Sequence, residues 1–182
     1  MTDARKGLVG FCVLVAVAFS TGCGLWPVAE PQPEPGPTTK PTVYQVGTFE
    51  EALADEMADL LNLMPYDGSE TDAPVVIAGN AVAGLTPAEA AGIKGLYDAR
   101  HPIAVVYATL DQIVALQQDV LGNASFQHAF PEGVTVAEIY AIDKEPDGDM
   151  WQWSSFPPAS TATSYSLKTE TSLETGQIIR DY

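Results

Sequence analysis

The chain has 182 residues and a formal net charge of −16 at neutral pH. A field of that sign repels phosphate groups, so DNA, RNA and anionic lipid heads are not expected as direct partners. Its only cysteines, Cys12 and Cys23, are too few for a thiol cluster that holds zinc or iron–sulfur.

The first 23 residues have the organisation of a secretory signal. Arg5 and Lys6 give a positive start, residues 8–19 form an apolar run of 12, and small residues lead to Cys23. A bilayer span needs about 20 apolar residues, so this run predicts a cleaved signal and not a transmembrane helix.

The end of this segment, Ser20-Thr21-Gly22-Cys23, resembles a bacterial lipoprotein signal peptide. The resemblance implies cleavage after residue 22, acylation of Cys23 with fatty acids such as palmitate, and a place in the cell envelope. Gly24 implies the outer membrane if the source is Gram-negative. Several acyl chains anchor a protein stably. Without residues 1–22, 23 acids and 6 bases remain, a net charge of −17.

A proline-rich tether is predicted for residues 23–41, and one domain for residues 42–182. Six prolines between residues 27 and 41 favour an extended polyproline II conformation. Sixteen such residues reach roughly 50 Å, enough to hold a domain clear of a lipid surface.

The domain is predicted to begin with a short strand at residues 43–46, followed by a helix. Thr48 and Glu51 have the spacing of a capping box, and apolar residues recur at helical intervals from Phe49 to Met64. The acidic residues between them indicate a solvated face.

The central segment predicts two strand–helix units. Residues 75–78 and 103–108 are continuous apolar runs typical of buried parallel strands. Each precedes a capping box, Thr86 with Glu89 and Thr109 with Gln112, and Gly122 is expected to end the second helix.

A β-hairpin is expected next, because residues 137–144 and 149–155 flank a Pro-Asp-Gly turn. Residues 165–169 could add one more strand. The spacing of Thr171 and Glu174 predicts a terminal helix that is short or truncated. Together these elements predict an α/β fold: a small sandwich with a mainly parallel sheet, flanking helices and an antiparallel edge hairpin.

Two motifs resemble ligand sites without completing them. Residues 79–86 resemble a phosphate-binding loop, but Leu85 stands where such a loop has lysine, so nucleotide binding is not expected. Four acidic residues alternate around Gly148 and are a weak calcium candidate. A calcium loop that begins at the first of these acids needs a glutamate at its position 12, and that position is Ser154, so a hairpin turn is the favoured interpretation. The four are Asp143, Glu145, Asp147 and Asp149.

The two histidines do not form a recognisable catalytic motif. His101 follows a predicted helix, and His128 lies in a loop near Ser125. A Ser125/His128 hydrolase pair lacks the Gly-x-Ser-x-Gly elbow. Trp151 and Trp153 are expected to pack one face of the hairpin, with stacking on a sugar or peptide as the alternative.

The carboxyl ends of the parallel strands are the expected ligand edge. They place Asn80, Thr109 and Asp111 on adjacent loops. No cofactor or metal is predicted. The favoured function is a non-catalytic binding or interaction module with an unidentified protein or small-molecule partner. The alternatives are an extracytoplasmic hydrolase and an accessory domain of a larger, truncated secreted protein.

Overall fold

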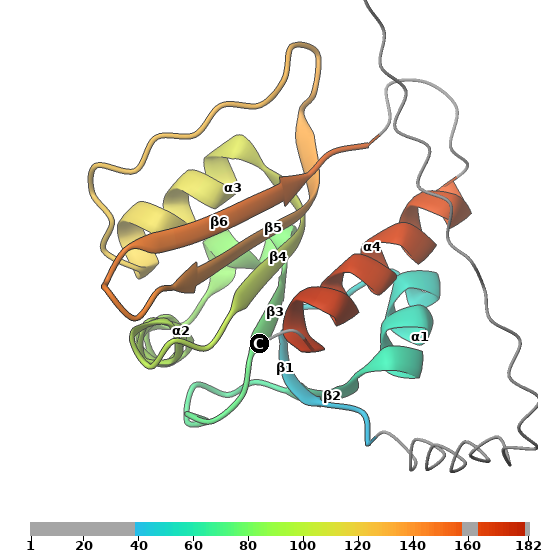
Figure 1. Cartoon of the computed structure of the whole chain (residues 1–182), viewed down its shortest axis with the longest axis horizontal. Helices are drawn as coiled ribbons and strands as arrows, with labels where there is room; N and C mark the ends of the chain where they lie inside the picture. Colours follow the sequence, from blue (N-terminus) through green and yellow to red (C-terminus); the bar gives the residue numbers. More distant parts are fainter. Residues whose placement is uncertain (1–38, 158–163, 181–182) are drawn as a thin grey trace, which may run out of the picture. The chain divides into compact units, whose positions relative to one another are not determined.

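The computed structural model describes residues 39–157 and 164–180 (Figure 1). The predicted signal segment, Cys23 and nearly all of the tether lie outside the described residues. The described chain forms the α/β sandwich with a mainly parallel sheet that the sequence predicts.

A six-stranded sheet in the order β2-β1-β3-β4-β5-β6 forms the centre of the domain. The first four strands in this order are parallel, and β5 and β6 add an antiparallel edge. The strands are β1 (Thr42–Val46), β2 (Asn62–Pro65), β3 (Val75–Ala78), β4 (Ile103–Thr109), β5 (Val136–Lys144) and β6 (Met150–Ser155).

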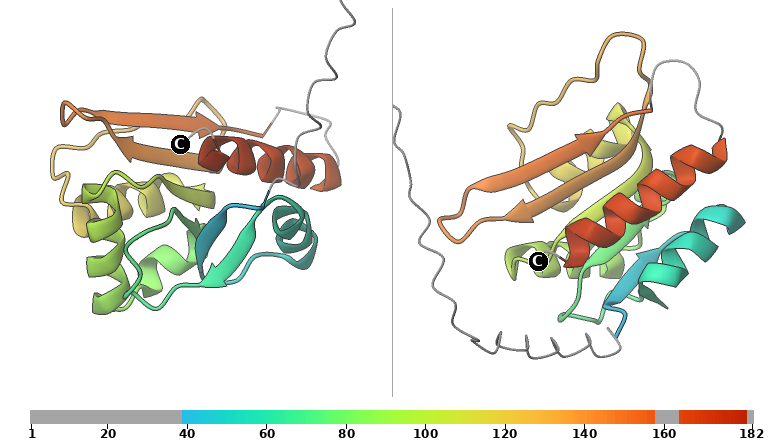
Figure 2. Two further views of the ribbon diagram at one scale, coloured as in Figure 1. Left: turned by 60° about the horizontal axis from the view of Figure 1, so that its bottom comes forward. Right: turned by 45° about the vertical axis from the view of Figure 1, so that its right-hand side comes forward.

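Helices cover both faces of this sheet (Figure 2). They are α1 (Glu51–Leu60), α2 (Pro87–Asp98), α3 (Leu110–Ala115) and α4 (Ser164–Arg180), with a 3-10 turn η1 (Gly79–Gly84) and a π-helical turn η2 (Leu116–Val120). Along β3, Val75 and Ile77 pack with residues of α2 and α3, whereas Val76 packs with residues of α1 and α4. This alternation explains why the central strands are apolar at every position.

The predicted starts of α2 and α3 are confirmed. The Thr86 side chain accepts a hydrogen bond from the Glu89 amide at 3.2 Å, and the Glu89 carboxylate accepts one from the Thr86 amide at 2.8 Å. Thr109 and Gln112 form the same reciprocal pair at the start of α3. Each pair satisfies two backbone donors that a helix start otherwise leaves open.

The prediction for the first helix is wrong at both ends. Helix α1 begins at Glu51, with Glu50 as N-cap and no side-chain cap, so Thr48 and Glu51 do not form a capping box. Phe49 precedes the helix and is buried among the apolar residues beneath α1. The predicted helix through Met64 ends at Leu60, because Asn62–Pro65 forms the edge strand β2 beside β1.

The prediction for the C-terminal segment is also wrong in detail. Residues 165–169 lie in helix α4 and not in a strand, and Thr171 lies inside that helix and not at its N-cap. Thr171 and Thr175 are fully buried, and the Thr175 hydroxyl donates to the Thr171 carbonyl at 2.7 Å. Helix α4 lies beside α1 (Figures 1 and 2). Packing, more than capping, therefore decides which face of α4 points inward.

The predicted hairpin is confirmed, with Tyr140 opposite Ser154 and Ile142 opposite Gln152. The carbonyl of Asp149 accepts from the Glu145 amide at 2.8 Å across the turn. Among the described helices, none is long and apolar enough to cross a bilayer.

Candidate functional site

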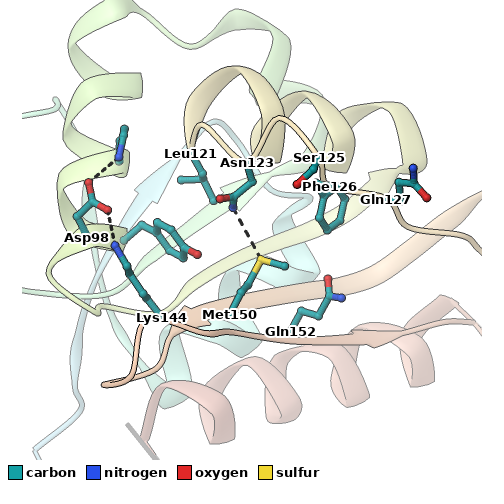
Figure 3. A pocket seen from close by; sticks show the side chains of 12 residues that line it. Asp98, Leu121, Asn123, Ser125, Phe126, Gln127, Lys144, Met150 and Gln152 are labelled. Carbon is teal, nitrogen blue, oxygen red and sulfur yellow. Dashed lines mark hydrogen bonds and ion pairs between the residues drawn. The ribbon is translucent and has the colours of Figure 1, made fainter.

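A cavity of about 650 Å³ lies where the end of α2, the segment after η2 and the β5–β6 hairpin meet (Figure 3). We call it the hairpin cavity. Its polar lining includes Lys94, Asp98, Asn123, Gln127, Lys144 and Gln152. Its volume is in the range of small-molecule sites in proteins, and its lining is more polar than that of most such sites.

A buried chain of hydrogen bonds holds two of these amides in place. The Gln117 amide donates to the Tyr140 hydroxyl at 2.6 Å, and that hydroxyl donates to the Gln152 carbonyl oxygen at 3.1 Å. The side-chain NH₂ of Asn123 donates to the side-chain carbonyl oxygen of Gln117 at 2.6 Å. Asn123 and Gln152 are therefore linked through two fully buried residues, and their remaining polar atoms are available at the cavity wall.

Burial keeps the Tyr140 hydroxyl in its protonated form. The pKa of Tyr140 lies above its ordinary value mainly because burial disfavours the phenolate, although the hydrogen bond from Gln117 acts in the opposite direction. The hydroxyl consequently remains a donor to Gln152 at neutral pH.

The π-helical turn η2 puts Gln117 and Asn123 in position. The backbone N–H of Leu121 donates to the backbone carbonyl of Leu116 at 2.9 Å, one residue further back than in an α-helix. The backbone N–H of Asn123 donates to the backbone carbonyl of Gln117 at 2.8 Å. Gly122 follows with φ +81°, the positive φ expected of a helix-ending glycine. Single π turns occur often at functional sites because they redirect side chains within a helix.

A cluster of charged side chains forms the other end of the hairpin cavity. The Asp98 carboxylate receives Lys94 at 2.6 Å and Lys144 at 2.9 Å. These hydrogen bonds, from Lys94 and then Lys144, lower the pKa of Asp98. The Lys144 ammonium also lies 5.7 Å from the centre of the Tyr97 ring. Two positive charges and one negative charge leave the cluster with a local charge of +1.

His128 lies further along the same face of the hairpin. Its Nε2 is 3.3 Å from the Ser154 hydroxyl and not paired with Ser125. The imidazole packs between aromatic rings, with Tyr140 and Phe126 at centroid distances of 5.6 and 5.9 Å. This burial lowers the pKa of His128, so the ring is neutral at neutral pH. Among the described residues, no carboxylate hydrogen-bonds to the ring.

A second, smaller concavity of about 190 Å³ lies at the carboxyl ends of β1, β3 and β4. We call it the switch-point crevice, and its lining includes Phe49, Leu53, Asn80, Val106 and Tyr107. The connection from β1 through α1 leads to β2, toward one edge of the sheet. The connection from β3 through α2 leads to β4, toward the other edge. Ligands of open α/β sheets bind where the strand order reverses in this way.

Of the residues predicted for this edge, only Asn80 lines the switch-point crevice. Thr109 caps α3, and Asp111 is exposed in the first turn of that helix. The structure does not bring the three together around one concavity, and their role in ligand binding stays a prediction. Tyr107, which also lines the crevice, has a φ of 53°, unusual for a residue with a side chain.

The two weaker motifs have structural roles in the described chain. Gly79, in the loop that resembles a phosphate-binding loop, is buried against the backbone of Tyr107 and Ala108, which leaves no room for a Cβ atom. In the acidic turn, the Asp147 carboxylate accepts from the Asp149 amide at 3.0 Å. Within residues 39–157 and 164–180, no three His, Cys, Asp or Glu side chains converge as a metal ion requires.

Sequence reasoning did not identify the residues of the hairpin cavity. One signal was present: Gln117 occupies an inward position of its helix, one residue after Leu116 and four after Ile113. A polar residue on an apolar helix face indicates a buried hydrogen-bonding partner. The pairing of Gln117 with Tyr140, 23 positions away, depends on tertiary packing and has no local signature.

Comparison of the chain with protein-family models, curated proteins and solved structures finds no match.

Proposed function

We propose that this chain is a lipid-anchored cell-envelope protein that binds a small polar ligand in the hairpin cavity without transforming it. The observation that carries the proposal is the orientation of Asn123 and Gln152 by the buried Gln117–Tyr140 pair. Fixed polar groups at a cavity wall lower the entropic cost of binding, because they are already in the bound conformation.

The amino-acid sequence supports the anchor. Residues 8–19 and the Ser20-Thr21-Gly22-Cys23 ending resemble a lipoprotein signal, and the proline-rich residues after Cys23 are suited to a spacer. A tethered binding domain fits this arrangement, because the anchor keeps the domain in the envelope compartment and attached to its membrane.

The experiment is an NMR titration of the full-length, ¹⁵N-labelled chain in detergent with an acetylated dipeptide, a monosaccharide and a fatty acid. We expect the dipeptide or the monosaccharide to shift the side-chain NH₂ signals of Asn123, Gln127 and Gln152, and the predominantly apolar fatty acid to leave them in place. The NH₂ signal of Asn62, on the far edge strand, is the internal control and should not move. Shifts confined to Asn80, or no shift with any probe, contradict the proposal.

A hydrolase is the second candidate, favoured by the 3.3 Å contact between His128 and Ser154. A neutral imidazole beside a hydroxyl is the arrangement that general-base activation of serine requires. Labelling with a fluorophosphonate tests it: a hydrolase labels at Ser154 and loses the label in Ser154→Ala, whereas a binding protein is not labelled there.

A further inference from the structure

The wall of the hairpin cavity presents one donor and one acceptor. In the chain of hydrogen bonds that links them, Asn123 uses its amide nitrogen and Gln152 uses its carbonyl oxygen. This leaves the Asn123 carbonyl oxygen as an acceptor and the Gln152 NH₂ as a donor. Reversing the direction of every hydrogen bond between Asn123 and Gln152 exchanges the two roles and still leaves one donor and one acceptor.

Asn123 and Gln152 lie on either side of Met150 at the cavity wall (Figure 3). The Asn123 NH₂ contacts the Met150 sulfur at 3.8 Å, and Met150 and Gln152 are two residues apart on the same face of β6 (Figure 3). A donor and an acceptor on one wall complement the N–H and C=O of one residue of an extended peptide, because these two groups point to the same side of the backbone. A carboxylate or a phosphate, which offers acceptors only, does not match both.

The charged cluster selects for a different group at the other end. Lys94 and Lys144 each give a hydrogen bond to Asp98, and each ammonium has further donors. Their side chains are 46% and 33% exposed, so they can reach a ligand. The turn carboxylates Glu145, Asp147 and Asp149 are exposed to solvent and do not line the cavity, and salt screens their longer-range repulsion.

We propose that the hairpin cavity binds an acylated short peptide with a free carboxylate, the N–H and C=O of one of its residues held by Asn123 and Gln152 and its carboxylate by Lys144 and Lys94. This inference rests on the proposed function, since it names the ligand class of the same cavity. Met150, which also lines the cavity and is 37% exposed, supplies apolar surface for the side chains of such a ligand.

Isothermal titration of the full chain in detergent with N-acetyl-L-alanyl-L-alanine and with its C-terminal amide tests this inference. We expect the free acid to bind at least about fivefold more tightly than the amide, because a charged hydrogen bond is worth more than a neutral one. N-acetylglucosamine, which carries an amide but no carboxylate, should bind no better than the amidated peptide.

Two substitutions separate the two halves of the ligand. Gln152→Glu keeps the acceptor that Tyr140 needs and removes the donor at the wall, so both peptides should bind about tenfold more weakly. Lys144→Gln should reduce the preference for the free acid, and Lys94→Gln provides a second variant if Lys144→Gln does not fold. Gln177→Glu makes the same change as Gln152→Glu on the exposed side of α4 and should leave both affinities unchanged.

The outcomes distinguish this inference from the proposed function. Equal affinity for the acid and the amide, or full affinity in Gln152→Glu, overturns the inference. Binding of the monosaccharide in the cavity, without the peptides, overturns the ligand class and leaves the proposed function standing. Binding of the fatty acid alone contradicts both. If none of the probes shifts the signals of the cavity, both are contradicted.

Discussion

The side-chain amide of Gln117 donates to the hydroxyl of Tyr140 at 2.6 Å, and neither residue has exposed surface. Gln117 comes from the π-helical turn after α3 and Tyr140 from the middle of β5. Buried polar groups are costly unless each finds a partner, and this pair satisfies both while fixing Asn123 and Gln152. The pair therefore joins the stability of the domain to the geometry of the hairpin cavity.

The first prediction concerns this pair. Tyr140→Phe leaves the Gln117 NH₂ buried without its acceptor and should lower the free energy of unfolding by about 1–3 kcal/mol. Gln117→Leu removes the donor and should cost a similar amount. The double variant should lose less than the sum of the two, since no unpaired donor remains opposite the ring. Urea unfolding of the four proteins measures this coupling, and strictly additive losses contradict it.

The second prediction compares two glycines of α2. A Cβ atom at Gly92 would collide with the Tyr66 hydroxyl and the Gly68 carbonyl, whereas one at Gly95 would meet nothing within 4 Å. Gly92→Ala should therefore destabilise the protein by about 1–3 kcal/mol. Gly95→Ala should stabilise it by up to about 1 kcal/mol, because alanine loses less backbone entropy in a helix. Thermal unfolding of both variants tests the packing of α2, and equal effects would count against it.

The third prediction concerns pH. Glu138 is 2% exposed, and burial raises its pKa, with Glu170 and Glu174 of α4 adding to the rise and the Ser155 hydroxyl opposing it. A group whose folded pKa is raised binds its proton more tightly in the folded state. Its contribution to stability is therefore present below its ordinary pKa and is lost as the pH rises through its folded pKa.

Glu138→Gln mimics the protonated carboxyl at every pH. The Glu138→Gln protein should be more stable than the unsubstituted protein at pH 7. It should also lose less stability than the unsubstituted protein as the pH rises from the ordinary pKa of the Glu138 carboxyl to its folded pKa. Glu132→Gln, an exposed position with the same change in charge, is the control. Urea midpoints between pH 4 and pH 8 measure the difference. A destabilised Glu138→Gln protein at pH 7 would contradict the assigned environment.

The fourth prediction concerns the anchor. Cys23→Ser removes the acylation point, so the protein should move from the membrane fraction to the soluble fraction after a high-salt wash. Cys12→Ser changes the other cysteine of the chain and should leave the protein in the membrane fraction. Membrane retention of Cys23→Ser would show that the lipoprotein interpretation is wrong.

Local signals predicted the centre of the fold correctly. Thr86 with Glu89 and Thr109 with Gln112 cap their helices as their spacing indicates, because the bonds they form lie within four residues. The same pattern at Thr48 and Thr171 does not mark a helix start. Phe49 is buried before α1 begins, and Thr171 is buried within α4, so tertiary packing decides both boundaries.

The candidate site depends still more on tertiary structure. Asn80 was predicted from the general position of ligands in parallel sheets, and it does line a concavity. The hairpin cavity lies instead between α2 and the antiparallel edge, where no general rule places a site. Gln117, Tyr140 and Gln152 are far apart in the sequence, and only the pairing of β5 with β6 and the π-helical turn bring them together.

We expect the hairpin cavity, and not the switch-point crevice, to be the ligand site. A crystallographic fragment screen of the chain with small amides, carboxylic acids, sugars and aromatic compounds decides between the two. We expect the fragments to concentrate between Asn123 and Gln152, with amides hydrogen-bonded to both and carboxylates at Lys144. Fragments that gather at Asn80 and Tyr107 while the hairpin cavity stays empty would contradict the claim.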